Sequence, residues 1–184
     1  HDFIFRQLDI DGAYFLFPLQ AEELGGAVQG LKLLGAAGVN VTIPYKTAVM
    51  PFLDEIAPEA KKIGAVNTIV FQNKHTKGYN TDYQGFGLLL ERCGIGVAGK
   101  KAVILGTGGS AKMAACYLRD QGAAEIHQVT RGGGGSCTDF PFLSYGELSC
   151  FNGADILVNC TPVGMFPQMD DSPVERTLLS RFGT

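Results

Sequence analysis

The sequence predicts an α/β protein whose second half forms a doubly wound parallel sheet. Two observations support this class. Apolar strand-like runs alternate with helical periodicity along the chain, and from residue 100 onward a strand, a glycine turn, a helix and further strands follow one another. With 184 residues, 46% of them hydrophobic, the chain can bury a core. We expect two domains, residues 1–82 and 83–184, because the character of the sequence changes after Thr81.

Strands and helices alternate in the first half. Apolar residues recur at helical spacing between residues 20 and 34, and the run 38–46 is β-branched and apolar, as buried strands are. Pro44 in that run predicts a turn that projects Lys46 from the end of the strand. The elements expected before residue 82 are a strand at 13–19, a helix at 20–34 ended by Gly35, a buried strand at 38–46, a helix at 47–62 that Pro58 breaks, a strand at 65–71 and a polar turn at 72–77.

The second half has a clearer pattern. A run of apolar residues leads directly into Gly106, and small residues then recur on one helical face up to Gly122, which predicts the end of that helix. The expected elements are a helix at 83–93, a loop at 94–99, a strand at 100–106, the helix that ends at Gly122, a strand at 125–131 and a strand at 154–162. Residues 132–136 read Gly-Gly-Gly-Gly-Ser, the composition of a flexible linker, and a natural loop and an engineered insert both fit it.

Composition narrows the kind of partner. The formal net charge of -3 and the lack of any Lys/Arg run argue against nucleic acid and membrane surfaces and favour a small molecule. The five cysteines are scattered and odd in number, which argues against a disulfide framework and a zinc site, so we expect no metal and a reducing cytoplasm. No apolar run approaches the roughly 20 residues of a membrane span.

The glycine turn predicts a dinucleotide site. Gly106, Gly108 and Gly109 follow a strand and open a helix, where small residues let backbone N–H groups approach a pyrophosphate. The third small position is Ala111 or Ala114 instead of glycine, so the pattern departs from G-x-G-x-x-G, and a tight turn without a ligand is the alternative. After the next strand, Thr130 and Arg131 stand where NAD-binding proteins carry an acidic residue. Arginine suits a 2'-phosphate, so we favour NADP over NAD, the alternative being a solvated loop charge.

Lys46 and Asp82 are the candidate acid/base pair. Desolvation favours the neutral amine of a lysine and a nearby carboxylate favours the ammonium, so such a pair can hold and release a proton. Taken singly, each residue is more often a surface charge. Polar residues at the ends of apolar runs could line a cleft around a polyhydroxylated ligand or cap turns; these are Asn40, Thr42, Asn67, Thr68, Asn80 and Thr81.

Five motifs in order resemble the shikimate dehydrogenase family. They are N-V-T-I-P-Y-K (40–46), G-A-V-N-T (64–68), G-Y-N-T-D (78–82), G-T-G-G-S-A (106–111) and N-C-T-P-V-G-M (159–165). The resemblance implies a substrate domain followed by a Rossmann-like NADP-binding domain, and the reversible NADPH-dependent reduction of 3-dehydroshikimate to shikimate. It implies catalytic roles for Lys46 and Asp82 and substrate binding by Thr42 and Asn67. It also implies cofactor binding by Gly106, Gly108, Gly109, Ser110, Thr130 and Arg131.

The sequence departs from the family pattern at both ends and after Arg131. The family has a Ser-x-Ser-Pro segment before the position of His1 and a C-terminal helical segment with a Gln, and neither occurs in residues 1–184. If the chain is no longer than this, both domains are incomplete and we expect weakened substrate binding. In the family, the segment that binds the 2'-phosphate usually reads Asn/Ser-Arg-Thr and leads into a short helix, whereas glycines follow Arg131 here.

Three other functions stay open. An NAD-dependent quinate/shikimate dehydrogenase would share the Lys-Asp pair, a methylenetetrahydrofolate dehydrogenase would share the lysine and the dinucleotide domain, and a non-catalytic sensor would bind pathway ligands without turnover. Arg131 argues against the NAD-dependent enzyme, and the motifs at 40–46 and 78–82 argue against the methylenetetrahydrofolate dehydrogenase. An intact Lys46 and Asp82 argue against the non-catalytic sensor. The sequence leaves open a homodimer or a place in a bifunctional polypeptide, and Cys160 and Met165 fit either a nicotinamide pocket or core packing.

Overall fold

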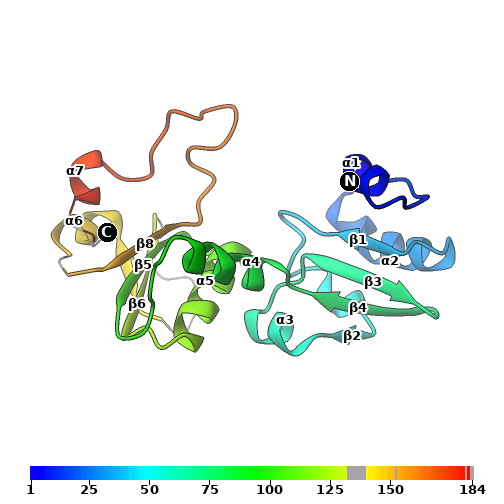
Figure 1. Cartoon of the computed structure of the whole chain (residues 1–184), viewed down its shortest axis with the longest axis horizontal. Helices are drawn as coiled ribbons and strands as arrows, with labels where there is room; N and C mark the ends of the chain where they lie inside the picture. The colour runs from blue at the N-terminus through cyan, green and yellow to red at the C-terminus, as the bar shows by residue number, and fades with distance from the viewer. Residues whose placement is uncertain (132–139, 152, 181, 183–184) are drawn as a thin grey trace.

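A computed structural model of the chain contains two four-stranded sheets with helices between them (Figure 1). The structure describes residues 1–131, 140–151, 153–180 and 182. The glycine-rich stretch at 132–136 lies outside the described residues, so its interpretation as a linker stays a prediction. The α/β class predicted from the sequence is confirmed.

The first sheet is mixed and has the order β1-β3-β4-β2. Its central pair is an antiparallel hairpin in which Asn73 and Lys74 both have positive φ, as a two-residue turn between twisted strands requires. Apolar side chains of Leu24, Val49 and Ile69 form the core against this sheet. The elements are α1 (Asp2–Gln7), a 3-10 turn (Ala21–Glu23), α2 (Leu24–Leu33), β1 (Gly38–Asn40), a 3-10 turn (Met50–Phe52), β2 (Glu55–Ile56), α3 (Pro58–Ile63), β3 (Thr68–Gln72) and β4 (His75–Tyr79).

Two strand predictions in this half are wrong or too long. Residues 13–19 form no strand, because no described segment pairs with their backbone, and Phe15 and Leu16 are exposed. The predicted buried strand at 38–46 is reduced to β1, a partly exposed edge strand. The chain turns after it, and the Tyr45 N–H donates to the Thr42 carbonyl at 2.9 Å.

The predictions for residues 47–62 and 72–77 also need correction. Instead of one helix, a 3-10 turn, β2 and α3 occupy 47–62, and Pro58 begins α3 because a first helical position needs no N–H donor. The polar turn is shorter than predicted, since β4 begins at His75.

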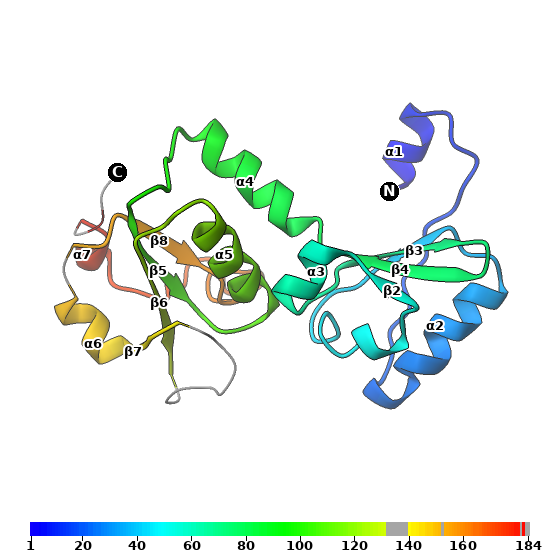
Figure 2. The same cartoon turned by 90° about the horizontal axis from the view of Figure 1, so that it is seen from below.

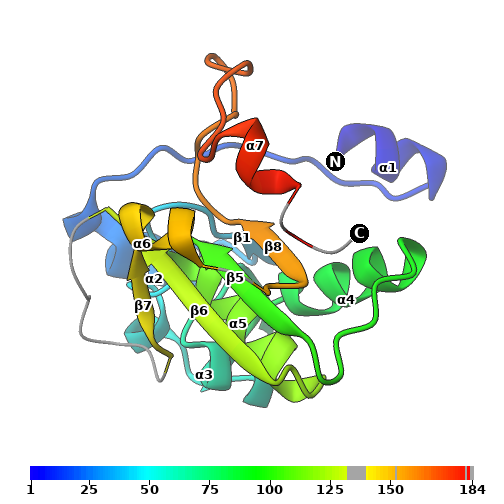
Figure 3. The same ribbon diagram turned by 90° about the vertical axis from the view of Figure 1, so that its left-hand side faces the viewer.

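The second sheet is entirely parallel, with the order β7-β6-β5-β8 (Figure 3). Helices α4 and α5 cover one face and α6 and α7 the other, which explains the continuous burial along β5. The predicted helices and strands between 83 and 131 and the strand within 154–162 are confirmed, whereas β7, α6 and α7 were not predicted. The elements are α4 (Asp82–Arg92), β5 (Lys101–Leu105), α5 (Gly109–Asp120), β6 (Glu125–Thr130), β7 (Phe142–Ser144), α6 (Tyr145–Cys150), β8 (Ile156–Asn159) and α7 (Arg176–Leu179).

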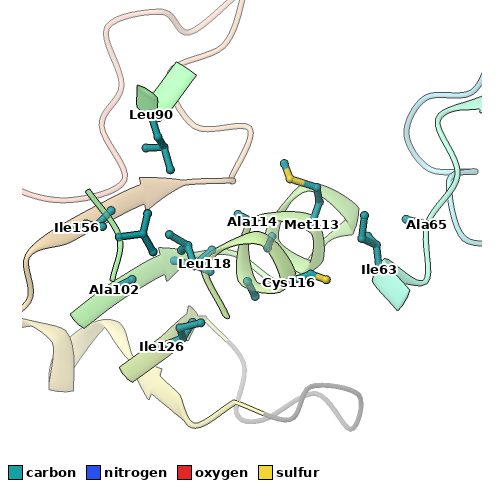
Figure 4. Close-up of a cluster of buried hydrophobic side chains, with 14 residues drawn as sticks. Ile63, Ala65, Leu90, Ala102, Met113, Ala114, Cys116, Leu118, Ile126 and Ile156 are labelled. Atoms are coloured by element: carbon teal, nitrogen blue, oxygen red, sulfur yellow. The ribbon is translucent and has the colours of Figure 1, made fainter. Parts of the chain in front are cut away.

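Helix α5 connects the two sheets. Figure 4 shows Leu118 on α5 among Ala102, Ile126 and Ile156, while Ile63 of α3 approaches α5 from the opposite side. Helices α3 and α5 lie against each other between the sheets (Figure 2). The orientation of α5 therefore decides how the two halves meet.

Replacing Leu118 with alanine tests this core. Leu118 is 0% exposed, so the change leaves a cavity, and we expect the free energy of unfolding to fall by about 2–5 kcal/mol. Leu88→Ala on α4 is the matched control, because Leu88 is 57% exposed and its loss is expected to change stability by about 0.5 kcal/mol or less. Urea unfolding followed by circular dichroism measures both values, and equal losses would contradict the packing described here.

Among the described residues, none of the helices has the length and apolar character needed to cross a membrane.

Candidate active site

Lys46 and Asp82 form an ion pair between the two halves of the chain. The Lys46 Nζ lies 2.6 Å from the Asp82 Oδ2, and the two side chains are 17% and 37% exposed. Lys46 lies in the turn after β1, where its carbonyl accepts from the Val66 N–H at 2.7 Å, and Asp82 is the first residue of α4. The lysine is thus largely desolvated while the carboxylate reaches solvent, an arrangement that can pass a proton between a bound ligand and water.

Asn67 holds the chain just before Asp82. Its Oδ1 accepts from the Thr81 N–H at 3.0 Å and from the Thr68 hydroxyl at 2.9 Å, and its Nδ2 donates to the Thr81 Oγ1 at 3.1 Å. Asn67 is 8% exposed, so this network is mostly shielded from water and fixes the start of α4. One Nδ2 hydrogen of Asn67 has no partner among the described residues and could bind a ligand.

The other polar residues named from the sequence divide into two groups. Asn80 is buried and its Nδ2 donates to the Ala65 carbonyl at 3.0 Å, so it fastens a turn, and the Asn40 Oδ1 accepts from the Tyr14 hydroxyl at 3.3 Å. Thr42 has an exposed side chain in the same turn as Lys46. Of these three residues, Asn80 is buried, whereas Thr42 and Asn40 are exposed and their side chains are open to a ligand.

The glycine turn lies directly against Lys46. Gly106 has φ +105°, a region that favours glycine, and a Cβ there would lie 3.2 Å from the Cys160 carbonyl oxygen. Gly108 is the N-cap of α5 and Gly109 its first residue, and a Cβ on Gly109 would lie 3.6 Å from the Lys46 Cδ. The N-terminus of α5, with Ser110 in its first turn, thus presents free N–H groups beside the ion pair.

Thr130 and Arg131 lie at the same edge of the sheet as the glycine turn. Strands β5 and β6 are parallel, with Leu105 opposite Val129, so Gly106 and Thr130 follow at neighbouring carboxyl ends. The Arg131 side chain is exposed just past β6. This is the position from which a cation could reach a phosphate at the end of a dinucleotide.

The loop after β8 closes the other side of the glycine turn. The Asn159 Oδ1 accepts from the Thr161 N–H at 2.9 Å and its Nδ2 donates to the Val163 carbonyl, which fixes the loop. Burial raises the pKa of the Cys160 thiol to about 11, so this side chain stays protonated near neutral pH. Cys160 therefore serves packing rather than nucleophilic chemistry, and Met165 is exposed.

Sequence reasoning missed the contacts that join the two halves. Lys62 pairs with Asp120, and the Tyr83 hydroxyl donates to the Asp120 Oδ2 at 2.7 Å. No local pattern marks these three residues, because the contacts span distant parts of the chain. Within the described ranges, no group of three or more His, Cys, Asp or Glu residues could hold a metal.

The chain matches known proteins along its whole length. The family model described as the shikimate dehydrogenase substrate binding domain matches residues 1–69. A curated relative from Clostridium beijerinckii, shikimate dehydrogenase (NADP(+)), is 46% identical over 188 residues, which cover 100% of this chain and 69% of the relative.

Two solved structures have the same fold. One is a chorismate mutase/shikimate 5-dehydrogenase fusion protein from Clostridium acetobutylicum, with 41% identity, a TM-score of 0.90 and coverage of 99% of this chain and 67% of that one. The other is shikimate 5-dehydrogenase from Thermus thermophilus in complex with NADP(H) and shikimate, with 31% identity, a TM-score of 0.80 and coverage of 97% and 67%.

Proposed function

Since the chain belongs to the shikimate dehydrogenase family, we propose that it catalyses the reversible, NADPH-dependent reduction of 3-dehydroshikimate to shikimate in aromatic amino acid biosynthesis. The observation that carries this proposal is the position of Lys46, paired with Asp82, beside Gly109 of the glycine turn, where a Cβ would lie 3.6 Å from the Lys46 Cδ. That position puts a proton donor beside the predicted dinucleotide site, and reduction of a ketone needs both a hydride and a proton.

The residues present fit a nicotinamide dinucleotide. A Cβ on Gly108 would meet nothing within 4 Å, so the backbone there is open to a ligand, and the 12-residue helix α5 directs its N-terminal N–H groups to the same place. We assign the phosphates to Gly106, Gly108, Gly109 and Ser110, and the 2'-phosphate end to Thr130 and Arg131. When bound, NADPH supplies the hydride.

Lys46 and Asp82 handle the proton. As the ring ketone becomes an alkoxide, the Lys46 ammonium donates a proton to that oxygen, and in the oxidation direction the neutral amine accepts it. Asp82 holds the Nζ at 2.6 Å and, being 37% exposed, links it to solvent for proton exchange. Thr42 and Asn67 bind the substrate hydroxyls on the same side as Lys46. In this assignment residues 1–82 bind substrate and 83–184 bind NADP.

Arg131 sets the cofactor preference in this proposal. We expect Arg131→Ala to raise KM for NADPH by about ten- to a hundredfold, the loss expected for hydrogen bonds to a charged phosphate, and to leave KM for NADH unchanged. Arg92→Ala is the matched control, because Arg92 is an exposed arginine at the end of α4. Steady-state kinetics with both cofactors measure this, and equal effects on NADPH and NADH would contradict a phosphate contact.

The activity is tested by following NADPH absorbance after addition of 3-dehydroshikimate, with NADH and with 3-dehydroquinate in parallel. The proposal predicts loss of NADPH with 3-dehydroshikimate. Oxidation of NADH with both ketones would favour a quinate/shikimate dehydrogenase. Ligand binding without turnover would favour a sensor.

We also propose that the enzyme works in the cytoplasm as a homodimer or as part of a bifunctional polypeptide. The described cysteines are all free, as a reducing compartment implies, and one structural relative is a fusion protein. Intact mass and light scattering of the purified protein distinguish the two assemblies.

A further inference from the structure

Asp120, the last residue of α5, joins three helices. Its Oδ1 pairs with the Lys62 ammonium of α3, and its Oδ2 accepts from the Tyr83 hydroxyl of α4 at 2.7 Å. The Asp120 side chain is 23% exposed, so these contacts are partly shielded from solvent. One carboxylate therefore links the helix that begins at the glycine turn to both neighbouring helices.

One partner of Asp120 adjoins a residue of the candidate active site, and the other lies close in sequence to a residue beside the glycine turn. Tyr83 directly follows Asp82, and its ring also packs edge-on against Tyr117 at 5.1 Å between centroids. Lys62 ends the turn of α3 that leads to Ala65, whose Cβ would lie 3.7 Å from a Cβ on Gly109. Displacement of Tyr83 would therefore shift Asp82 of the ion pair, and displacement of Lys62 would shift the segment beside the glycine turn.

Helix α5 thus has a lysine from another part of the chain beside each of its ends. At its first residue, Gly109, a Cβ would lie 3.6 Å from the Lys46 Cδ, and its last residue, Asp120, pairs with Lys62. Twelve helical residues span about 18 Å, so neighbours that far apart constrain the direction of the helix as well as its position. The ion pair at Asp120 therefore limits rotation of α5 about its N-terminal end at Gly109.

The protonation states of Asp120 and Tyr83 support the hydrogen bonds of this link. Burial raises the pKa of Asp120, but hydrogen bonds from Lys62 and Tyr83 and the charge of Lys62 outweigh it, and the pKa lies below its usual value. Burial and the hydrogen bond to Asp120 raise the pKa of Tyr83, so the phenol keeps its proton and donates it. The link is an ionised carboxylate with two donors at neutral pH.

We propose that Asp120 is a positioning residue for the dehydrogenase reaction, which holds α5 so that the dinucleotide turn and the Lys46–Asp82 pair stay aligned. The inference rests on the proposed function. Asp120 would act on the geometry of the complex of enzyme, NADPH and substrate, because substrate binding is assigned to residues before 83 and cofactor binding to residues from 83 onward. Asp120 touches neither ligand site directly.

The test separates alignment from binding. We expect Asp120→Ala to lower kcat by about tenfold, as a small misplacement of reacting groups does, and the Kd of NADPH and the Kd of shikimate, each measured alone, to stay within about twofold. Asp120→Asn, which keeps the shape, should show a smaller loss, and Asp120→Glu should restore part of it. Lys61→Ala is the matched control, since Lys61 is an exposed lysine on α3 for which the described residues offer no ion pair.

A double-mutant cycle tests whether the link is one unit. The losses of kcat caused by Lys62→Ala and by Asp120→Ala should not add in the double variant, because each substitution breaks the same contact. Additive losses would contradict the inference. So would an unchanged kcat in Asp120→Ala, or a rise in both Kd values that matches the loss of kcat.

Amide hydrogen exchange gives a second readout that does not depend on activity. In Asp120→Ala we expect faster exchange at both 62–66 and 106–112, with β5 and β6 unchanged. Faster exchange confined to 116–122 would show local fraying of α5 and overturn the inference. If the wild-type protein failed to oxidise NADPH, the proposed function would fall, and this exchange pattern would still decide whether Asp120 controls the placement of α5.

Discussion

Replacing Lys46 with alanine lowers kcat for 3-dehydroshikimate reduction by about two to four orders of magnitude, the usual contribution of a positioned proton donor. KM is expected to stay within about threefold, because Thr42, Asn67 and the glycine turn still bind the two ligands. The effect is large because the Lys46 Nζ, 17% exposed and 2.6 Å from Asp82, is the proton donor that we assign to the ketone oxygen, and its side chain lies beside Gly109 of the glycine turn.

Lys32 provides a closely matched control for Lys46. Its Nζ lies 2.7 Å from the Asp54 Oδ2, and its side chain is also 17% exposed, but the pair joins α2 to the residue directly before β2, whereas Lys46 lies beside the glycine turn. Lys32→Ala should lower stability and leave kcat near the wild-type value. If the two variants lost turnover equally, loss of an ion pair in general would explain the result, and the role of Lys46 would be wrong.

Replacing Asp82 with asparagine has the second largest expected effect. Asparagine keeps the size and an acceptor oxygen but removes the charge that holds the ammonium, so we expect kcat to fall by about ten- to a hundredfold with little change in KM. Asp54→Asn is the control, because it removes the carboxylate of the matched pair with Lys32.

Combining the two substitutions tests whether Lys46 and Asp82 act together. Residues that form one catalytic unit give losses that do not add, so the double variant Lys46→Ala/Asp82→Asn should be about as slow as Lys46→Ala alone. Steady-state kinetics on the four proteins supply this comparison. Fully additive losses would mean that Asp82 acts independently of Lys46.

The second half of the fold was predictable because its signals are local. A parallel strand covered on both faces needs a continuous apolar run, and residues 102–105 supply one directly before Gly106. The spacing of small residues on α5 and the positive φ at Gly122 likewise depend on neighbours in sequence. The predicted elements there match the structure closely.

The first half was less predictable because its strands depend on distant partners. The apolar residues at 13–17 satisfy the pattern of a strand, but a strand needs a paired backbone, and none of the described segments provides one. Pro58 shows a second difficulty, since proline can break a helix or begin one and the sequence alone does not decide which.

The candidate site shows the same division. Motifs around Lys46 and Asp82 named both residues, and the structure brings them together across 36 positions of sequence. The link from Asp120 to Tyr83 and Lys62 spans 37 and 58 positions and lies in no motif, so only the packing of α3, α4 and α5 reveals it. Side chains that act by holding helices carry no local chemical signature.

The most direct measurement for the central claim uses NADPH labelled with deuterium at the transferring position of the nicotinamide. The protein and 3-dehydroshikimate are added, and the product is analysed by mass spectrometry and NMR. We expect shikimate with one deuterium on the carbinol carbon, formed in step with NADPH consumption and strongly slowed in Lys46→Ala. Unlabelled shikimate, or no shikimate while both ligands bind, would contradict it.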